Sequence, residues 1–255
     1  MDFLQKWFEN VSQYPFELFS LSHIIIIVTH ILGIIILLVF VKKLPIKTIY
    51  IIRWGLFFLL IFSELSYQTW GIYNEAWNPR EFLPLQLCSI SGVIAILALL
   101  TQNQKLIQIT FFIAIFPAFL AVITPELFHG FPHFRFWQFF IHHLVLSWAG
   151  IFLVVTNNVN ISLKITLEIY TYLFVYAGII GFLVNPLFNA NFLFLAKSPS
   201  ANTPLEFLGV GLCYYVNLCL IGLGFFLLQL GIYKIMVRIY HRGHYFENLR
   251  IIKKD

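Results

Sequence analysis

Seven apolar runs follow one another along the chain, and polar or Pro/Gly-marked segments separate most of them. We place these runs at residues 22–41, 49–70, 84–101, 106–123, 137–156, 165–186 and 208–232. Each run is close to the ~20 residues that an α-helix needs to cross a bilayer. The pattern therefore predicts an all-α, polytopic membrane helix bundle with about seven transmembrane helices.

The segments at the two ends of the chain differ from these runs. Residues 3–21 mix aromatic with charged side chains, which is typical of a segment that lies on a membrane surface. Residues 234–255 are rich in Lys and Arg and predict a basic tail. Because no internal repeat or low-complexity linker interrupts the chain, we treat residues 1–255 as one integral membrane domain. Within it, residues 1–21 form the interfacial segment.

The composition excludes several other classes of protein. The chain is 60% hydrophobic and only 11% charged, whereas a soluble domain carries roughly 25% charged residues. Its net charge of +5 does not indicate a nucleic-acid partner, because the basic residues cluster beside the apolar runs. No Gly-rich phosphate loop is present, so no nucleotide or diffusible cofactor is implied.

Basic residues also predict the orientation, because cytoplasmic loops carry an excess of Lys and Arg. With seven spans, one side receives four of the basic residues, namely Lys6, Arg80, Arg135 and Lys197. The other side receives twelve, namely Lys42, Lys43, Lys47, Arg53, Lys105, Lys164, Lys234, Arg238, Arg242, Arg250, Lys253 and Lys254. The N-terminus is therefore predicted to lie outside and the C-terminus in the cytoplasm.

Polar residues gather at the predicted outer ends of the spans. The stretch PLQLCSISG, residues 84–92, opens an apolar run yet carries Gln86, Cys88, Ser89 and Ser91 in its first turns. Unsatisfied polar groups are costly in lipid, so this helix either lines a polar cavity or buries these groups against other helices. The remaining polar residues at the same predicted end are Glu64, His133, His142, His143, Asn185, Asn191 and Lys197. The sequence thus predicts one polar site in the outer half of the membrane.

Cys88 and the adjacent histidines are the candidate reactive groups. A lone cysteine in a membrane helix is usually an inert packing residue, but a nearby histidine can take the proton of a thiol. Neighbouring helical positions diverge by about 100°, so His142 and His143 cannot both face one partner. Glu64 has three open roles: to orient a histidine, to bind a substrate head group, or to donate a structural hydrogen bond.

A metal site is the alternative use of the histidines. His23 and His30 lie seven residues apart on one predicted helix face, and a group of four histidines follows the fourth apolar run, namely His129, His133, His142 and His143. These spacings match no tight zinc signature. We therefore predict no metal.

Three segments carry a resemblance to a known family. WNPREFLPLQLCSIS, TPELFHGFPHFRFWQFFIHHLV and NPLFNANFLFLAKSPSANTPLEFLG occur in this order. They resemble the YwaF-type bacterial integral membrane proteins, a family related to the eukaryotic transmembrane ether-phospholipid acyltransferase. The resemblance runs from about Phe16 to Tyr215. It implies a seven-span fold in a bacterial plasma membrane, with Cys88 as acyl-accepting nucleophile. His143 is its assisting histidine and His142 the rival.

The function that this resemblance implies is that of a lipid acyltransferase or acyl hydrolase. A cysteine acyl intermediate would form on a membrane phospholipid, with a lysophospholipid or water as acceptor. The expected substrate-binding residues are Gln86, Ser89, Glu64, His133, Asn185, Asn191 and Lys197. The alternative is a non-enzymatic membrane protein, either a small-molecule or lipid transporter or an accessory structural protein.

Overall fold

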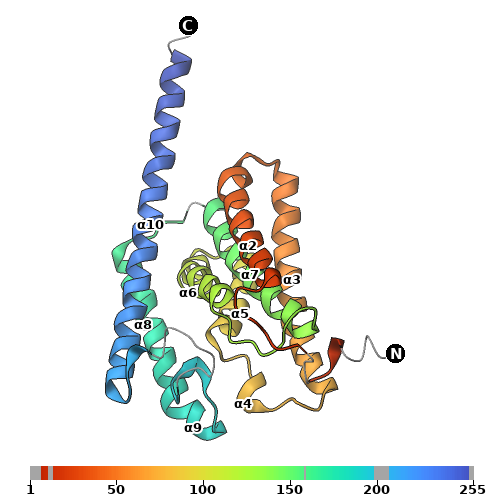
Figure 1. Ribbon diagram of the computed structural model, residues 1–255. Helices are drawn as coiled ribbons and strands as arrows, with labels where there is room; N and C mark the ends of the chain where they lie inside the picture. Colours follow the sequence, from red (N-terminus) through yellow and green to blue (C-terminus); the bar gives the residue numbers. More distant parts are fainter. Residues whose placement is uncertain (1–6, 11–13, 158, 198–206, 253–255) are drawn as a thin grey trace.

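The computed structural model describes residues 7–10, 14–157, 159–197 and 207–252, with side chains described up to residue 239. These ranges fold into α-helices with short 3₁₀ and π segments (Figure 1). The elements are α2 (Leu21–Phe40), η1 (Val41–Lys43), α3 (Ile46–Tyr73), α4 (Pro79–Phe82), α5 (Leu87–Thr101), α6 (Gln104–Ile123), α7 (Phe134–Thr156), α8 (Leu163–Ile179), η2 (Ile180–Val184), α9 (Asn185–Phe188), η3 (Phe192–Phe194) and α10 (Leu212–Ile252).

Six helical stretches in the described residues are long and apolar enough to cross a membrane. They are Leu21–Lys43, Ile46–Tyr73, Gln104–Ile123, Phe134–Thr156, Leu163–Phe188 and Leu212–Ile239. These stretches confirm the prediction of an all-α, multi-pass membrane protein, while the count of seven spans and the orientation stay predictions.

The third predicted run, residues 84–101, forms a shorter helix than expected. Helix α5 has 15 residues, which gives it a length of ~22 Å, whereas the hydrocarbon core is ~30 Å thick. Its predicted start was wrong because Leu83 precedes a proline and is extended, as such residues usually are. Two hydrogen bonds hold the residues just before the helix. The Tyr176 hydroxyl donates to the Leu85 carbonyl (2.9 Å), and the Gln86 Oε1 accepts from the Leu193 amide (2.9 Å).

Helix α10 also differs from the prediction. Residues 234–252, expected as a basic tail, continue the helix to Ile252. Figure 1 shows that this part of α10 extends beyond the rest of the bundle.

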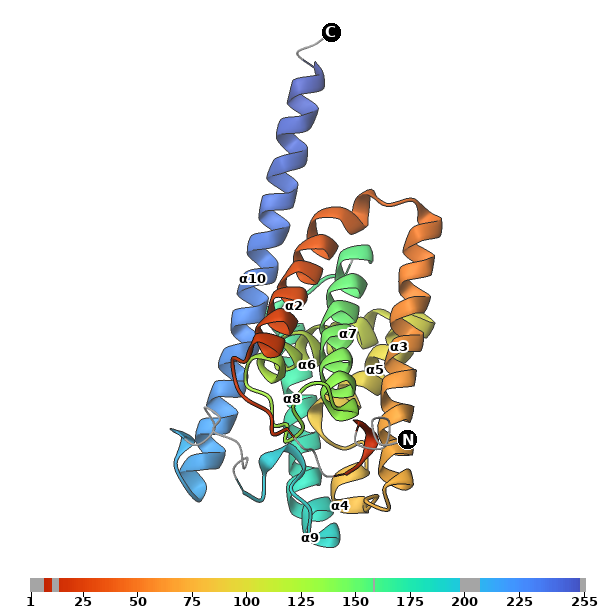
Figure 2. The ribbon, with the colours of Figure 1, turned by 45° about the vertical axis from the view of Figure 1, so that its right-hand side comes forward.

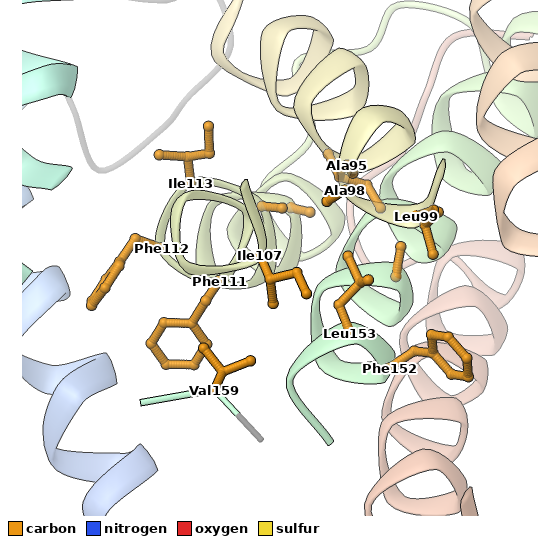
Figure 3. Packing of buried hydrophobic residues seen from close by; sticks show 14 of the residues in the cluster. Ala95, Ala98, Leu99, Ile107, Phe111, Phe112, Ile113, Phe152, Leu153 and Val159 are labelled. Carbon is orange, nitrogen blue, oxygen red and sulfur yellow. The ribbon is translucent and has the colours of Figure 1, made fainter. Parts of the chain in front are cut away.

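Helices α6 and α7 form the centre of the bundle. Within their apolar stretches 50% and 67% of the residues are buried, whereas the other four spans bury only 11–17%. Small residues let the helices approach, as is common in membranes: a Cβ added to Gly150 would lie 2.6 Å from Ile115 Cγ1. Figure 3 shows Ala95 and Ala98 of α5 in the cluster of buried hydrophobic residues that also contains Ile107 and Phe112 of α6. This close packing makes α7 the helix that contacts most of the others.

The bundle has two chemically different ends (Figures 1 and 2). One end, here called the site end, carries α4, α9 and the loop 124–133. The opposite end carries the α2–α3 connection. On the opposite-end side, Lys105 pairs with Glu168 at 2.9 Å, and the Asn157 amide donates to Gln102 Oε1 at 3.1 Å.

Ser91 of α5 compensates for a proline in α6. Pro117 has no N–H, so the carbonyl of Ile113, four residues earlier, loses its usual intrahelical donor. The buried Ser91 hydroxyl lies 2.8 Å from that carbonyl and 2.5 Å from the Leu87 carbonyl. Ser91 was expected among the polar residues of the site, but its hydrogen bonds join α5 to α6.

Replacing Ser91 with alanine should therefore destabilise the bundle. The Ile113 carbonyl would be buried without a donor, which costs about 1–3 kcal/mol. Thermal unfolding in detergent should show a lower midpoint for Ser91→Ala than for Ser89→Ala, because Ser89 has no hydrogen bond in the described residues. In a Pro117→Ala background, which restores the N–H, Ser91→Ala should cost clearly less. An equal cost in both backgrounds would refute this pairing.

Candidate functional site

A polar seam lies where α3 faces α7. We define the polar seam as Ser63, Tyr67 and Trp70 of α3 together with Arg135, Gln138 and His142 of α7. The spacing within each set places its members on one helix face. Two contacts join the helices: the Gln138 amide donates to the Ser63 carbonyl at 3.2 Å, and His142 Nδ1 lies 3.2 Å from Ser63 Oγ.

The deep end of the seam reaches Cys88. His142 Nε2 lies 3.4 Å from the backbone carbonyl oxygen of Cys88. Its ring also packs over Gly92, where an added Cβ would lie 3.3 Å from His142 Cε1. The carbonyl can only accept, so in this contact Nε2 carries the proton and Nδ1 accepts from the Ser63 hydroxyl. His142 thus contacts both α3 and the first turns of α5.

His143 has different neighbours from His142. Its Nδ1 donates to the Phe139 carbonyl of its own helix at 2.7 Å, and its ring lies 4.2 Å from that of Phe139. The Cys88 sulfur makes no hydrogen bond to any described residue, and the side chain is half-buried against the apolar core. Of the two histidines, His142 is therefore the one that contacts Cys88, through the backbone. The sequence-based preference for His143 as the base stays a prediction.

Glu64 is hydrogen-bonded within α3. Its Oε1 accepts from Gln68 Nε2 at 2.8 Å. Gln68 also donates to the Phe82 carbonyl at 2.8 Å and accepts from Trp77 Nε1 at 2.9 Å. Glu64 thus contributes to fixing the segment around α4, and this geometry favours a structural role over the orientation of a histidine.

Most of the other expected substrate-binding residues organise the loop after α8. The Asn185 amide bonds both the N–H and the carbonyl of Phe192, at 2.9 and 3.0 Å. Asn191 Oδ1 accepts from the amides of Ala196 and Lys197, both at 3.0 Å. Gln86 reaches the same loop through Leu193. Ser89 is half-buried and the Lys197 side chain is exposed. Ser198 and Pro199, which follow Lys197 in the third segment of the family resemblance, lie outside the described residues.

Two stacked histidines hold a short N-terminal segment at the site end. We call residues 7–10 the strap. His133 Nε2 donates to the Glu9 carbonyl and His129 Nε2 to the Asn10 carbonyl, both at 2.8 Å. Trp70 Nε1 donates to the Phe8 carbonyl at 2.9 Å. His133, expected to bind substrate, also accepts the Arg135 amide through Nδ1 and so caps α7.

The strap should loosen as the pH falls. Burial lowers the pKa of His133 to about 4 and also lowers that of His129, with the nearby Arg135 acting in the same direction. Because the pKa of His133 is lowered in the folded protein, the stability that its neutral form contributes is fully present above pH ~6.5 and is lost as the pH falls through ~4. Hydrogen exchange of residues 7–10, corrected for intrinsic rates, should therefore accelerate between pH 7.5 and 4.

His133→Asn provides the matched control for this experiment. Asparagine is a good N-cap residue, so it can still accept the Arg135 amide, but it does not titrate. The variant should show a weaker pH dependence of strap protection. Protection that is the same at both pH values in the unmodified protein would contradict the prediction.

The histidines whose side chains the structure describes do not converge on a metal site. His23 Nε2 donates to the Val122 carbonyl at 2.7 Å, and its Nδ1 accepts the Phe19 amide. His30 lies farther along α2, against Phe119 and Trp148. Across the described ranges, no group of three His, Cys, Asp or Glu side chains is arranged to hold a metal ion.

Arg135 is a site residue that sequence reasoning missed. It was counted only as a basic residue of the predicted outer side. Its guanidinium lies 4.1 Å from the centre of the Tyr67 ring and 5.3 Å from that of Trp70, and it donates to Gln138 Oε1. The available signal was its spacing: Arg135, Gln138 and His142 stand at positions i, i+3 and i+7 of one helix face.

Comparisons with known proteins give one family. A family model described as the TMEM164 family matches residues 18–230, which include the helices from α2 to α9, the first part of α10 and the polar seam. No curated protein and no solved structure matches the chain.

Proposed function

Because the chain belongs to the TMEM164 family, we propose that it is a lipid acyltransferase or acyl hydrolase that forms an acyl thioester on Cys88. The observation that carries this proposal is the 3.4 Å contact between the buried His142 and the backbone of Cys88. Polar groups placed within a membrane helix bundle are costly and usually functional. The resemblance of residues 77–91 and 124–145 to proteins related to the ether-phospholipid acyltransferase supports the same chemistry.

His142 is the proposed base. To accept the thiol proton, its Nε2 must be unprotonated, so the ring proton moves to Nδ1. The Ser63 hydroxyl, 3.2 Å away, can accept a hydrogen bond from Nδ1 in that tautomer. The Gln138 amide donates to the backbone carbonyl of Ser63. Ser63 is therefore a positioning residue, and the Cys88 side chain must turn toward Nε2 for proton transfer.

The first half-reaction acylates the cysteine. His142 removes the proton of Cys88, and the thiolate attacks the carbonyl carbon of a phospholipid ester. The C–O bond of the ester then breaks, and the departing lysophospholipid oxygen takes the proton from His142. The amide N–H groups at the start of α5 and the Gln86 Nε2 are the candidate donors to the oxyanion.

The second half-reaction regenerates the thiol. A lysophospholipid hydroxyl, or water in the hydrolase variant, loses its proton to His142 and attacks the thioester carbonyl. The C–S bond breaks, and the Cys88 sulfur recovers the proton. No diffusible cofactor is needed to balance either step.

We also infer that the chain crosses the membrane seven times, with α5 as a short third crossing and the N-terminus outside. Support comes from the twelve-to-four division of basic residues. In a cysteine-free background, Gln104→Cys and Asn189→Cys place single thiols at exposed positions. An impermeant thiol reagent applied to intact cells should label only the cysteine at 189. Labelling of the cysteine at 104 would refute this topology.

A transfer assay tests the proposed activity. Purified protein in detergent receives a phospholipid labelled in its acyl chain and an unlabelled lysophospholipid. The label should move to the lysophospholipid or appear as free fatty acid. If neither product forms above the level of a Cys88→Ala preparation, the non-enzymatic alternative gains support.

A further inference from the structure

Arg135 is a cation whose hydrogen-bonding capacity is mostly unused. A guanidinium has five N–H donors, and in the described residues one bond, to Gln138 Oε1, engages it. The ion pair Lys105–Glu168 is the only salt bridge within the described ranges, so no described carboxylate pairs with Arg135. Glu64 favours the charged guanidinium electrostatically but does not reach ion-pair distance. The half-buried charge therefore has no carboxylate in contact, an unfavourable arrangement that an anionic ligand would complete.

Aromatic rings pack against the Arg135 guanidinium. Tyr67 contacts both Arg135 and Phe82, with its ring centre 4.1 Å from the Arg135 Cζ and 4.6 Å from the centre of the Phe82 ring. Gly71 makes room for this arrangement, since a Cβ there would lie 2.2 Å from Phe82 Cε1. Stacking orients an arginine in advance, so it loses less freedom when it binds a planar or tetrahedral oxyanion.

We propose that Arg135 binds the phosphodiester group of a membrane phospholipid. Arg135 is the second residue of α7, so it lies where this span meets the headgroup region, and Trp70 and Tyr67 are typical of that depth. Phosphate is the anion that phospholipids present there, and the arginine fork binds phosphate oxygens bidentately.

The position of Arg135 relative to Cys88 would let it place a phospholipid substrate for the reaction. This step rests on the proposed function. Arg135 and His142 share one face of α7 and lie seven residues apart, a rise of ~10 Å. A phospholipid held by its phosphate at Arg135 would extend its ester-linked chains along α7 toward His142 and Cys88. Arg135 would thus select phosphate-bearing lipids over neutral diacylglycerols.

The test measures binding independently of acyl transfer. Thermal unfolding of the detergent-purified protein is followed with dioctanoyl phosphatidylglycerol, with dioctanoyl glycerol and with inorganic phosphate. The phospholipid should raise the midpoint, and the other two compounds should not. Arg135→Gln should weaken this stabilisation at least tenfold in apparent affinity, and Arg135→Lys, which keeps the charge without the fork, should retain part of it. Arg80→Gln is the matched control, since Arg80 is an exposed arginine at the same end, and it should bind as the unmodified protein does.

Three results would overturn the assignment: unchanged binding by Arg135→Gln, equal stabilisation by dioctanoyl glycerol, or equal stabilisation by inorganic phosphate. The last would assign the site to free phosphate. The same measurements in a Cys88→Ala background separate this proposal from the acyl-transfer proposal. Arg135-dependent binding without any acylation of Cys88 would leave the lipid site standing and remove the enzyme function. Full acylation of Cys88 by phospholipid in the Arg135→Gln variant would support the enzyme function and remove the lipid site at Arg135.

Discussion

Cys88→Ala is expected to abolish acyl transfer while the protein remains folded. The variant removes the only proposed acceptor of the acyl group, so the rate should fall on the order of 10³-fold or more. The side chain lies at the edge of the apolar core and its sulfur has no hydrogen bond in the described residues. The thermal unfolding midpoint should therefore change little. The labelled-phospholipid transfer assay and an unfolding scan on the same preparation provide both measurements.

Two other cysteines provide controls for this prediction. Cys213 is exposed at the start of α10, and Cys219 is half-buried, with its carbonyl accepting from Tyr170. Neither lies on the polar seam, so alanine at either position should leave transfer within about twofold. Cys88→Ser should retain at most a trace, because a hydroxyl is the poorer nucleophile. Full transfer by Cys88→Ala would refute the nucleophile assignment.

His142→Ala is expected to have the second largest effect. Loss of a general base typically costs about 10²–10⁴-fold in rate. The variant also removes the contacts with Ser63 and the Cys88 carbonyl, so some loss of stability is expected. His142→Gln separates the two effects, because glutamine keeps hydrogen-bonding capacity but cannot accept the thiol proton. It should remain folded and inactive. Transfer rates and alkylation of Cys88 by iodoacetamide measure the outcome.

His143→Ala is the comparison that decides between the two histidines. His143 bonds its own helix at Phe139, so its loss should lower stability and slow transfer less than tenfold. If His143→Ala abolishes transfer and His142→Gln does not, the assignment of the base from the structure is wrong and the original preference for His143 is restored.

The helices could be predicted because membrane-spanning segments must be apolar for about 20 residues. The start of α5 could not be predicted in the same way. Residues 83–86 are as apolar as a helix entrance, but Pro84 and the long-range bonds with Tyr176 and Leu193 keep them outside the helix. Hydropathy reports burial in an apolar medium and does not report such bonds between distant segments.

The site could be predicted only in part for a related reason. The gathering of polar residues at one end was visible, whereas the partner of each polar group was not. Ser91 satisfies a carbonyl of α6, and Asn185 fixes a loop, so both are polar for structural reasons. His142 and His143 are adjacent in sequence, and only the tertiary contacts of His142 with Ser63, Cys88 and Gly92 distinguish them.

The most direct test of the central claim is the mass of the protein after incubation with a labelled phospholipid. The account predicts an added acyl group on the peptide that contains Cys88, released by neutral hydroxylamine as expected for a thioester and lost in Cys88→Ala. An unmodified Cys88 after lipid turnover, or the same acyl group on Cys213 or Cys219 with Cys88 free, would contradict it.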